Sequence, residues 1–129
     1  MYYDYKEGKK KIEEILNNNA EIQKKEVPKD DSNFTYNNGI KSLIVSVFVD
    51  IIGSKKLIEG GKDIVVAKVL GSFTPEITSI MNSSDNARQI GVRGDCVYGV
   101  FSTPYQSDIY ELLTISTYIN CWIKCWINY

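Results

Sequence analysis

One apolar stretch constrains the fold of this chain more than any other feature. Residues 40–49 read Ile-Lys-Ser-Leu-Ile-Val-Ser-Val-Phe-Val, a run that is rich in β-branched residues and carries a single charge. Runs of this kind are typical of strands that are buried on both faces. The sequence therefore predicts a central strand over 40–49, and not a strand at the edge of a sheet.

The residues after this run predict a turn and a short helix. Asp50 ends the run, and Gly53 and Ser54 are residue types that favour a turn. A helical segment is expected over 55–59, because Gly60-Gly61 follows it and glycine commonly ends helices.

A longer helix is predicted next. Apolar residues recur at three- and four-residue steps from Val66 to Met81, which is the spacing of one helix face packed on a sheet. Pro75 lies inside this run. Since proline lacks a backbone N–H and clashes with the preceding turn, we expect the helix either to kink or to restart with Thr74 as its cap.

The rest of the chain predicts a hairpin and a final helix. Residues 87–92 and 96–101 have the composition of strands, and Arg93-Gly94-Asp95 between them suits a hairpin turn. Apolar residues over 109–127 follow a helical period. The order strand, helix, helix, strand, strand, helix predicts an α+β fold with a ferredoxin-like split β-α-β core that lacks its last strand. If that strand normally pairs beside 40–49, an apolar edge stays unpaired here.

The first part of the chain has a different character. Residues 5–22 show a helical period that Asn17-Asn18-Asn19 interrupts, and 26–39 is rich in residues of turns and irregular chain. We expect an N-terminal helical arm and loop over 1–39 and a folded core over 40–129.

Composition excludes several classes of function. The 129 residues carry 15 Lys and Arg against 16 Asp and Glu, a net charge of -1, so no basic face for nucleic acid is indicated. No run of about 18 apolar residues occurs, and the start does not resemble a signal peptide. We expect a cytoplasmic protein without a nucleic-acid or membrane partner.

The residue types available for chemistry are limited. With no histidine in the chain, imidazole-activated serine or cysteine nucleophiles and histidine-ligated metal sites are excluded. Cys96, Cys121 and Cys125 match no zinc framework and are expected to be free thiols. Chemistry must therefore rest on carboxylates, lysine, tyrosine, backbone dipoles or bound metal.

Two aspartates stand where a site could form. Asp50 ends the apolar strand and Asp95 lies in the hairpin turn, and in a split β-α-β sheet these two elements are neighbours. Converging carboxylates suit divalent cations, which prefer hard oxygen ligands. Each residue also has a purely structural interpretation: Asp50 as a helix N-cap, Asp95 as a turn residue, and Ser54 and Lys55 as an exposed helix start.

The segments around the two aspartates resemble the metal-binding motifs of class III adenylate and guanylate cyclases. The first reads Val-Phe-Val-Asp-Ile-Ile-Gly-Ser over 47–54, and the second reads Gly-Val-Arg-Gly-Asp-Cys-Val-Tyr-Gly-Val-Phe over 91–101. Within that superfamily the chain is most similar to the bacterial pyrimidine cyclases of the Pycsar antiphage systems. The similarity spans roughly residues 4–120 and includes the segments 4–8, 12–17, 28–35 and 107–111.

The resemblance implies a partial class III cyclase catalytic domain over 40–129. Asp50 and Asp95 would bind two Mn²⁺ or Mg²⁺ ions, with the main-chain carbonyl of Ile51 as a further ligand. The turn Ile52-Gly53-Ser54, with Lys55, would bind the phosphates of the substrate. Such enzymes are phosphorus-oxygen lyases that convert a nucleoside triphosphate into its 3′,5′-cyclic monophosphate and pyrophosphate.

The resemblance also implies a substrate class and partners. Purine cyclases usually carry lysine or glutamate four positions before the second aspartate, where this chain has Gly91, so a pyrimidine is favoured. The expected substrate is UTP or CTP, with UTP preferred, and Arg93 is a donor that could face a pyrimidine carbonyl. The family works as homodimers, and the cyclic UMP would signal phage infection to a separate cyclic-nucleotide-sensing effector.

The chain departs from the family pattern in several places. Ile52 and Lys55 stand where the family has an arginine-like residue and a threonine, and Pro75 lies in a helix that is normally uninterrupted. Family members continue into strands bearing an asparagine and an arginine that stabilise the transition state, whereas this chain ends at Tyr129. Loss of such donors typically costs about a hundredfold to a thousandfold in rate, so weak or no activity is expected from this truncated chain alone.

Three alternatives remain open from the sequence. The chain could be a catalytically silent module that binds metal and nucleotide and acts through association. It could instead be a purine (adenylate) cyclase. It could also be a ferredoxin-like interaction domain in which Asp50 and Asp95 are only cap and turn residues.

Overall fold

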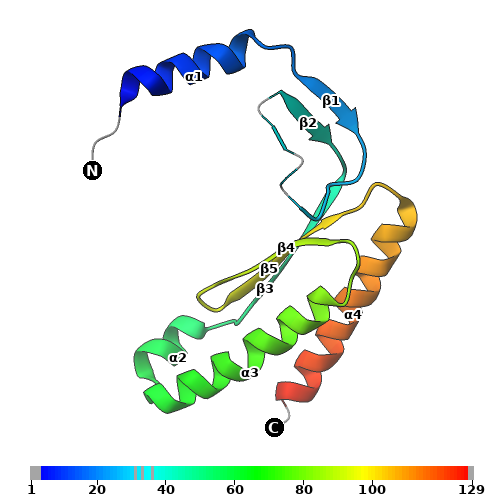
Figure 1. The fold of residues 1–129 in the computed structure, drawn as a ribbon. Helices are drawn as coiled ribbons and strands as arrows, with labels where there is room; N and C mark the ends of the chain where they lie inside the picture. The colour runs from blue at the N-terminus through cyan, green and yellow to red at the C-terminus, as the bar shows by residue number, and fades with distance from the viewer. Residues whose placement is uncertain (1–3, 31, 33, 36, 128–129) are drawn as a thin grey trace. The chain divides into compact units, whose positions relative to one another are not determined.

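The computed structural model describes residues 4–30, 32, 34–35 and 37–127 of the chain. Within this part the chain forms two compact units, residues 1–42 and residues 43–129. The first holds α1, β1 and β2, and the second holds β3, α2, α3, β4, β5 and α4 in that order (Figure 1).

The first unit is a helix followed by a small sheet. Helix α1 (Tyr5–Asn17) is capped by Asp4, whose Oδ1 accepts the amides of Lys6 at 2.9 Å and Glu7 at 3.3 Å. Strand β1 (Glu21–Lys24) pairs in parallel with β2 (Asn38–Lys41). The loop expected between them is irregular where it is described, and its residues Asp31, Asn33 and Tyr36 lie outside the described part.

The single strand predicted over 40–49 is in fact divided between two sheets. Ile40 and Lys41 belong to β2, the chain leaves strand geometry at Ser42 and Leu43, and β3 runs over Ile44–Asp50. The boundary between the two units falls at this break.

The second unit is built on a three-stranded antiparallel sheet. Strands β4 (Ala87–Arg93) and β5 (Cys96–Ser102) form the predicted hairpin, and the strand order is β3-β5-β4. Strand β3 pairs with β5 without a break, from Ile44 opposite Ser102 to Asp50 opposite Cys96. The predicted α+β class is confirmed.

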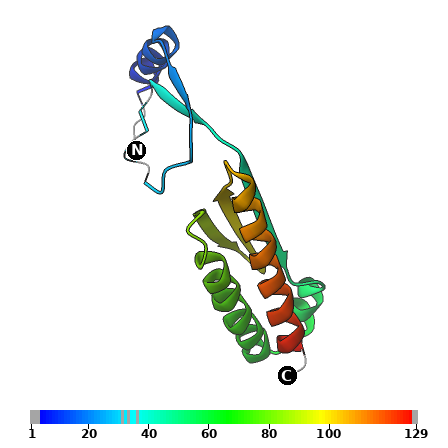
Figure 2. The same ribbon diagram turned by 90° about the vertical axis from the view of Figure 1, so that its right-hand side faces the viewer.

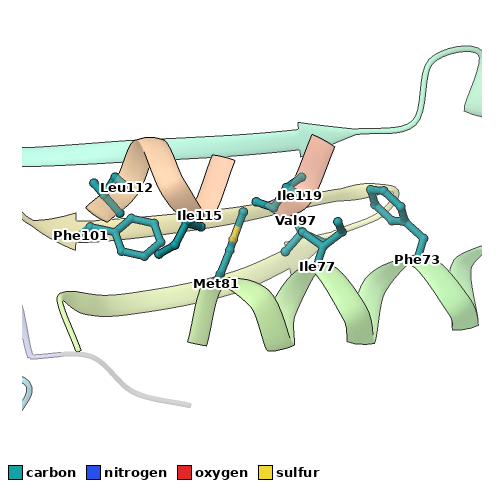
Figure 3. Close-up of a cluster of buried hydrophobic side chains, with 8 residues drawn as sticks. All are labelled: Phe73, Ile77, Met81, Val97, Phe101, Leu112, Ile115 and Ile119. Atoms are coloured by element: carbon teal, nitrogen blue, oxygen red, sulfur yellow. The ribbon is translucent and has the colours of Figure 1, made fainter. Parts of the chain in front are cut away.

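Two helices cover one face of this sheet. Helices α3 (Asp63–Asn82) and α4 (Gln106–Ile127) lie side by side along it, and the short α2 (Ser54–Gly60) follows β3 (Figure 2). The core between helices and sheet contains three residues each from α3 and α4 and two from β5 (Figure 3): Phe73, Ile77, Met81, Leu112, Ile115, Ile119, Val97 and Phe101.

The prediction that 40–49 is a central strand buried on both faces is wrong. Strand β3 lies at one edge of the sheet, and its side chains alternate between half-buried and exposed. Ile44 is 54% exposed and Phe48 is 69% exposed. The cause is that α3 and α4 cover only one face, so the even-numbered residues of β3 face solvent despite their apolar character.

Helix α3 runs through Pro75 without a restart. The helix is continuous over Asp63–Asn82, so Thr74 is not a cap. By length and composition alone α3 could also cross a membrane, and it is the one such helix in the described part of the chain. Its Phe73, Ile77 and Met81 are buried in the core, whereas Ile64 and Val65 in its first turn are exposed.

The tryptophans of α4 take part in the packing of the two helices. Trp122 and Trp126 stack on each other with ring centroids 5.5 Å apart, and both lie against Phe73. The indole N–H of Trp126 donates to Ser72 Oγ at 3.0 Å. These side chains therefore pack against α3.

Candidate functional site

The turn after β3 is set by one glycine. Gly53 has φ 79° and ψ 12°, the geometry of the third residue of a type II turn, and the Ser54 amide donates to the Ile51 carbonyl at 3.2 Å. A side chain at position 53 would be strained in this left-handed conformation. The turn lets Ser54 begin α2 directly beyond the end of the strand.

A second tight turn presents Asp95. Gly94 has φ 65°, and Arg93 pairs with Cys96 across the turn, so Gly94-Asp95 is a two-residue hairpin loop. Positive φ at the first of two central residues is characteristic of a type II′ turn, which suits the twist of antiparallel strands. Asp95 is therefore placed at the tip of the hairpin, as the sequence predicted.

The pairing of β3 with β5 brings the two aspartates together. Asp50 is directly opposite Cys96, the neighbour of Asp95. The Ser54 hydroxyl and the Asp50 side chain both lie close enough to the Asp95 carboxylate to affect its pKa. Figure 1 shows the β4–β5 turn beside the start of α2. Three residues from three elements thus meet at one end of the sheet.

These contacts lower the pKa of Asp95 below its ordinary value of 3.8. The largest cause is the hydrogen bond from Ser54, followed by one from the backbone N–H of Asp95 itself. A smaller lowering of the Asp95 pKa comes from the neighbouring Asp50 side chain. Donors that favour the charged carboxylate keep Asp95 ionised, which is the form that binds cations.

The face of the sheet that carries no helix extends this site. Residues directly opposite each other in neighbouring strands share a face, so Asp50, Cys96 and Arg93 form one row across the sheet. We call this uncovered side the open face. Arg93 is exposed at the end of β4, in the same row as Asp50.

An aromatic pair occupies the next row of the open face. Phe48, Tyr98 and Gly91 are opposite one another, and the rings of Phe48 and Tyr98 stack with centroids 6.2 Å apart and planes at 28°. Tyr98 lies over Gly91, where a Cβ would come within 2.5 Å of its ring. Gln89 Nε2 donates to the Tyr98 hydroxyl at 3.4 Å. Gly91, which has no side chain to contact a base, is thus covered by the ring of Tyr98.

The remaining predicted residues lie on the turn and the first turn of α2. Ile52 is fully exposed, and the Lys55 ammonium is 3.8 Å from Glu59 Oε1. The amides of Ile52, Gly53 and Lys55 make no backbone hydrogen bond with other described residues. They are therefore available to an anion at the end of β3.

The oxygen atoms at this site supply only part of the coordination shell of a divalent cation. Asp50 and Asp95 supply two carboxylates, and the Ile51 carbonyl, which already accepts from Ser54, has a second lone pair. Nowhere in the described ranges do three or more His, Cys, Asp or Glu side chains cluster closely enough to hold a metal. Magnesium and manganese commonly use one or two carboxylates and complete their shells with water and substrate phosphates, so the set is compatible with them.

One structural interpretation of these residues is contradicted. Gly53 is the N-cap of α2, and no side chain caps that helix, so Asp50 is not its cap. Asp95 is a turn residue and also lies beside Ser54 and Asp50, so a structural and a functional role for Asp95 are compatible. The three cysteines are free, as expected.

Phe48 and Tyr98 were not predicted as site residues. The sequence did indicate that Phe48 shares a face with Asp50, because side chains two positions apart in a strand point to the same face and Phe48 precedes Asp50 by two residues. No comparable signal existed for Tyr98, since its place beside Phe48 depends on the register between β3 and β5.

Two curated relatives are similar to this chain over most of its length. The chain is 43% identical to a uridylate cyclase of Treponema porcinum over 125 residues, which are 96% of this chain and 43% of the relative. It is 28% identical to a uridylate cyclase of Gulbenkiania mobilis over 123 residues, 92% of this chain and 48% of that relative. No family model matches the chain. The chain spans under half the length of these curated relatives, and over almost its whole length it is a homologue of uridylate cyclases.

Proposed function

We propose that this chain carries the metal- and phosphate-binding part of a pyrimidine nucleotide cyclase of the class III type, with UTP as its substrate. The observation that carries the proposal is the meeting of Asp50, Asp95 and Ser54 at one end of the sheet. The identity to a uridylate cyclase over 96% of the chain supports it. The strand order β3-β5-β4 is also that of the first three strands of a ferredoxin-like core.

In the proposed reaction the ribose 3′-oxygen attacks the α-phosphorus of UTP. A new P–O bond forms the 3′,5′-cyclic monophosphate, the bond to the β-phosphate oxygen breaks, pyrophosphate leaves, and the hydroxyl proton passes to solvent. Divalent cations bound at the carboxylates would lower the pKa of the 3′-hydroxyl and offset the charge of the phosphates. The absence of histidine agrees with a reaction that needs no side-chain base.

The residues of this chain would bind and orient the substrate. Ser54 favours the ionised form of Asp95 by lowering its pKa. Asp50 and Asp95 would supply the carboxylate oxygens that hold the cations. The amides of Ile52 and Gly53, with the Lys55 side chain, would bind phosphate oxygens. The flat surface of Phe48 and Tyr98 lies one row away on the open face and suits stacking of a planar base.

The test is metal-dependent nucleotide binding by the 129-residue chain. Titration calorimetry with UTP should give a heat of binding that requires Mn²⁺. The double change Asp50→Asn, Asp95→Asn should abolish it, whereas Glu76→Gln, at an exposed acid of α3, should leave it unchanged. Binding that survives the double change, or that needs no metal, would contradict the proposed site.

Turnover is tested separately. The chain and a version extended with the remaining sequence of a relative are each incubated with Mn²⁺ and the four common ribonucleoside triphosphates, and the product is analysed by mass spectrometry. We expect cyclic UMP from the extended version. A cyclic purine nucleotide as the main product would overturn the pyrimidine assignment, and binding without turnover by either version would overturn the cyclase assignment.

The second candidate is a catalytically silent module that binds nucleotide and acts by association. The same meeting of Asp50, Asp95 and Ser54 would serve binding without chemistry. It predicts Mn²⁺-dependent UTP binding with no cyclic product from this chain. A role in antiphage signalling through a separate effector remains part of the proposal for the whole cyclase. Expression of the extended version with such an effector, under phage infection, would test that role.

A further inference from the structure

Two cysteines lie one helical turn apart near the end of α4. Cys121 and Cys125 are both free and both exposed. Free cysteine is otherwise among the most buried residue types, and its reactivity more often than its packing explains its position. The buried residues of α4 are Leu112, Ile115 and Ile119, so neither cysteine is part of the core.

The spacing of the two cysteines places their thiols side by side. Residues four apart in an α-helix lie on one face, with Cβ atoms about 5–6 Å apart. A disulfide needs Cβ atoms about 3.5–4.5 Å apart, so this turn of α4 would have to distort to close one. An ion held in line by two bonds of about 2.3 Å, the length of a zinc–thiolate bond, needs sulfurs about 4.6 Å apart. Rotation of the two side chains reaches this separation, so the pair suits a shared ion better than a disulfide.

The chemistry around the pair selects a soft ion with few ligands. Residues 117–127 contain no Asp or Glu, so this part of the helix offers no carboxylate to a hard cation. Thiolates select soft ions such as Cu(I) and zinc, but zinc sites use three or four protein ligands. Among the residues that the structure describes, no group of three or more His, Cys, Asp or Glu could hold a metal. Two thiolates without a third ligand suit a monovalent ion that binds two ligands in line, which is typical of Cu(I).

A positive charge lies in the same turn as the two thiols. Lys124 is in the last turn of α4 and directly precedes Cys125. When both thiols bind Cu(I), they release two protons to solvent, and the two thiolates with one Cu(I) carry one net negative charge. A nearby cation offsets this charge.

We propose that Cys121 and Cys125 form a binding site for one monovalent soft metal ion, with Cu(I) as its biological occupant. The ion bridges one turn of α4. Each cysteine directly precedes a tryptophan, Trp122 or Trp126, whose ring lies against Phe73 of α3. The bound ion therefore fixes the turn that carries these aromatic contacts. The site uses no residue of the proposed nucleotide site, so failure of either proposal leaves the other standing.

Anaerobic titration with Cu(I), in competition with a chromophoric Cu(I) chelator, tests the proposal on the 129-residue chain. We expect one ion per chain and a fall in tryptophan fluorescence, because the ion binds beside both indoles. Cys121→Ser and Cys125→Ser should each abolish both effects. Cys96→Ser, at the half-buried cysteine of β5, is the control and should leave them unchanged.

Two further variants test the spacing of the thiols. In the Cys125→Ser background, Thr117→Cys places a thiol four residues before Cys121, and Cu(I) binding should return. Asn120→Cys in the same background places a thiol next to Cys121 in sequence but on another side of the helix, so binding should stay lost. Thr117 and Asn120 are both exposed, so neither change disturbs the core.

Several results would overturn the proposal. Absence of binding in the competition would do so, as would binding that survives either single serine variant, which would indicate an adventitious ion only. One ion for every two chains would also contradict it, because the ion would then join thiols of different molecules. Binding that returns with both Thr117→Cys and Asn120→Cys, or with neither, would show that the helical spacing does not form the site.

Discussion

Ser54 is the residue whose replacement most directly tests the geometry at the end of β3. Its hydroxyl donates the hydrogen bond that contributes most to the low pKa of Asp95. Without that donor the charged carboxylate loses its main stabilising contact. We expect Ser54→Ala to raise the pKa of Asp95 toward 3.8, as measured by NMR titration of its carboxyl carbon.

The effect of Ser54→Ala on stability depends on pH, because the pKa of Asp95 differs between the folded and unfolded states. A carboxyl whose pKa is lower in the folded state stabilises that state above pH 3.8, and this contribution disappears as the pH falls through the lower, folded-state pKa. Ser54→Ala should therefore lower stability at neutral pH and make unfolding less sensitive to acid. An unchanged Asp95 titration in Ser54→Ala would show that the hydroxyl does not bond the carboxylate in solution.

Gly91 and Tyr98 form a pair that a double-mutant cycle can resolve. A Cβ at position 91 would lie within 2.5 Å of the Tyr98 ring, so Gly91→Ala should displace the ring from Phe48. We expect the free energy of unfolding, measured in urea, to fall by about 0.5–1.5 kcal/mol, which is the contribution of one aromatic pair. In a Tyr98→Ala background Gly91→Ala should cost little more, and equal costs in both backgrounds would contradict this coupling.

At the scale of elements, two helices are held together by one aromatic cluster. Trp126 stacks on Trp122, lies against Phe73 and donates to Ser72. Trp126→Phe removes the hydrogen bond and part of the ring contact, and we expect a loss of about 0.5–1.5 kcal/mol in the free energy of unfolding. Tyr118→Phe, at a side chain 58% exposed on the same helix, is the control and should change stability little. Equal losses in the two variants would contradict a special role for Trp126.

The start of α4 is tied to the loop that precedes β4. Glu111 accepts from the Ser84 hydroxyl at 2.5 Å and from Asn86 Nδ2 at 2.9 Å, and Asp108 accepts the Tyr105 amide at 2.8 Å. These contacts give a structural role to residues that the sequence linked only to a family resemblance. Because Ser84 is 5% exposed, Glu111→Ala leaves a buried hydroxyl without this acceptor.

We expect Glu111→Ala to cost about 1–3 kcal/mol in chemical unfolding. Glu76→Ala, at an exposed carboxylate of α3, provides the comparison for loss of an acidic side chain. If Glu111→Ala were no more costly than Glu76→Ala, the network would contribute nothing measurable to stability.

At the scale of the whole molecule, the hydrophobic core lies entirely within one unit. All eight buried core residues belong to the unit formed by residues 43–129. We expect a chain of residues 43–129 to keep a cooperative thermal transition, with a Tm within a few degrees of the full chain, as followed by circular dichroism. Loss of that transition would mean that residues 1–42 contribute to the core's stability.

Local sequence features predicted most of the helices and strands of the second unit. The turn glycines, the helical periods and the Gly-Asp hairpin predicted β4, β5, α2, α3 and α4 close to their observed bounds, because each depends on contacts within a few residues. The pair Asp50 and Asp95 could likewise be selected from the ends of their elements and from the resemblance.

Only the tertiary structure decided which face of the sheet stayed open and what Ser54 and Tyr98 contact. An apolar run is compatible with burial on two faces or one, and the choice depends on where the helices pack. The contacts of Asp95 with Ser54 and of Tyr98 with Phe48 join residues distant in sequence, so they exist only once β3 and β5 have paired in register.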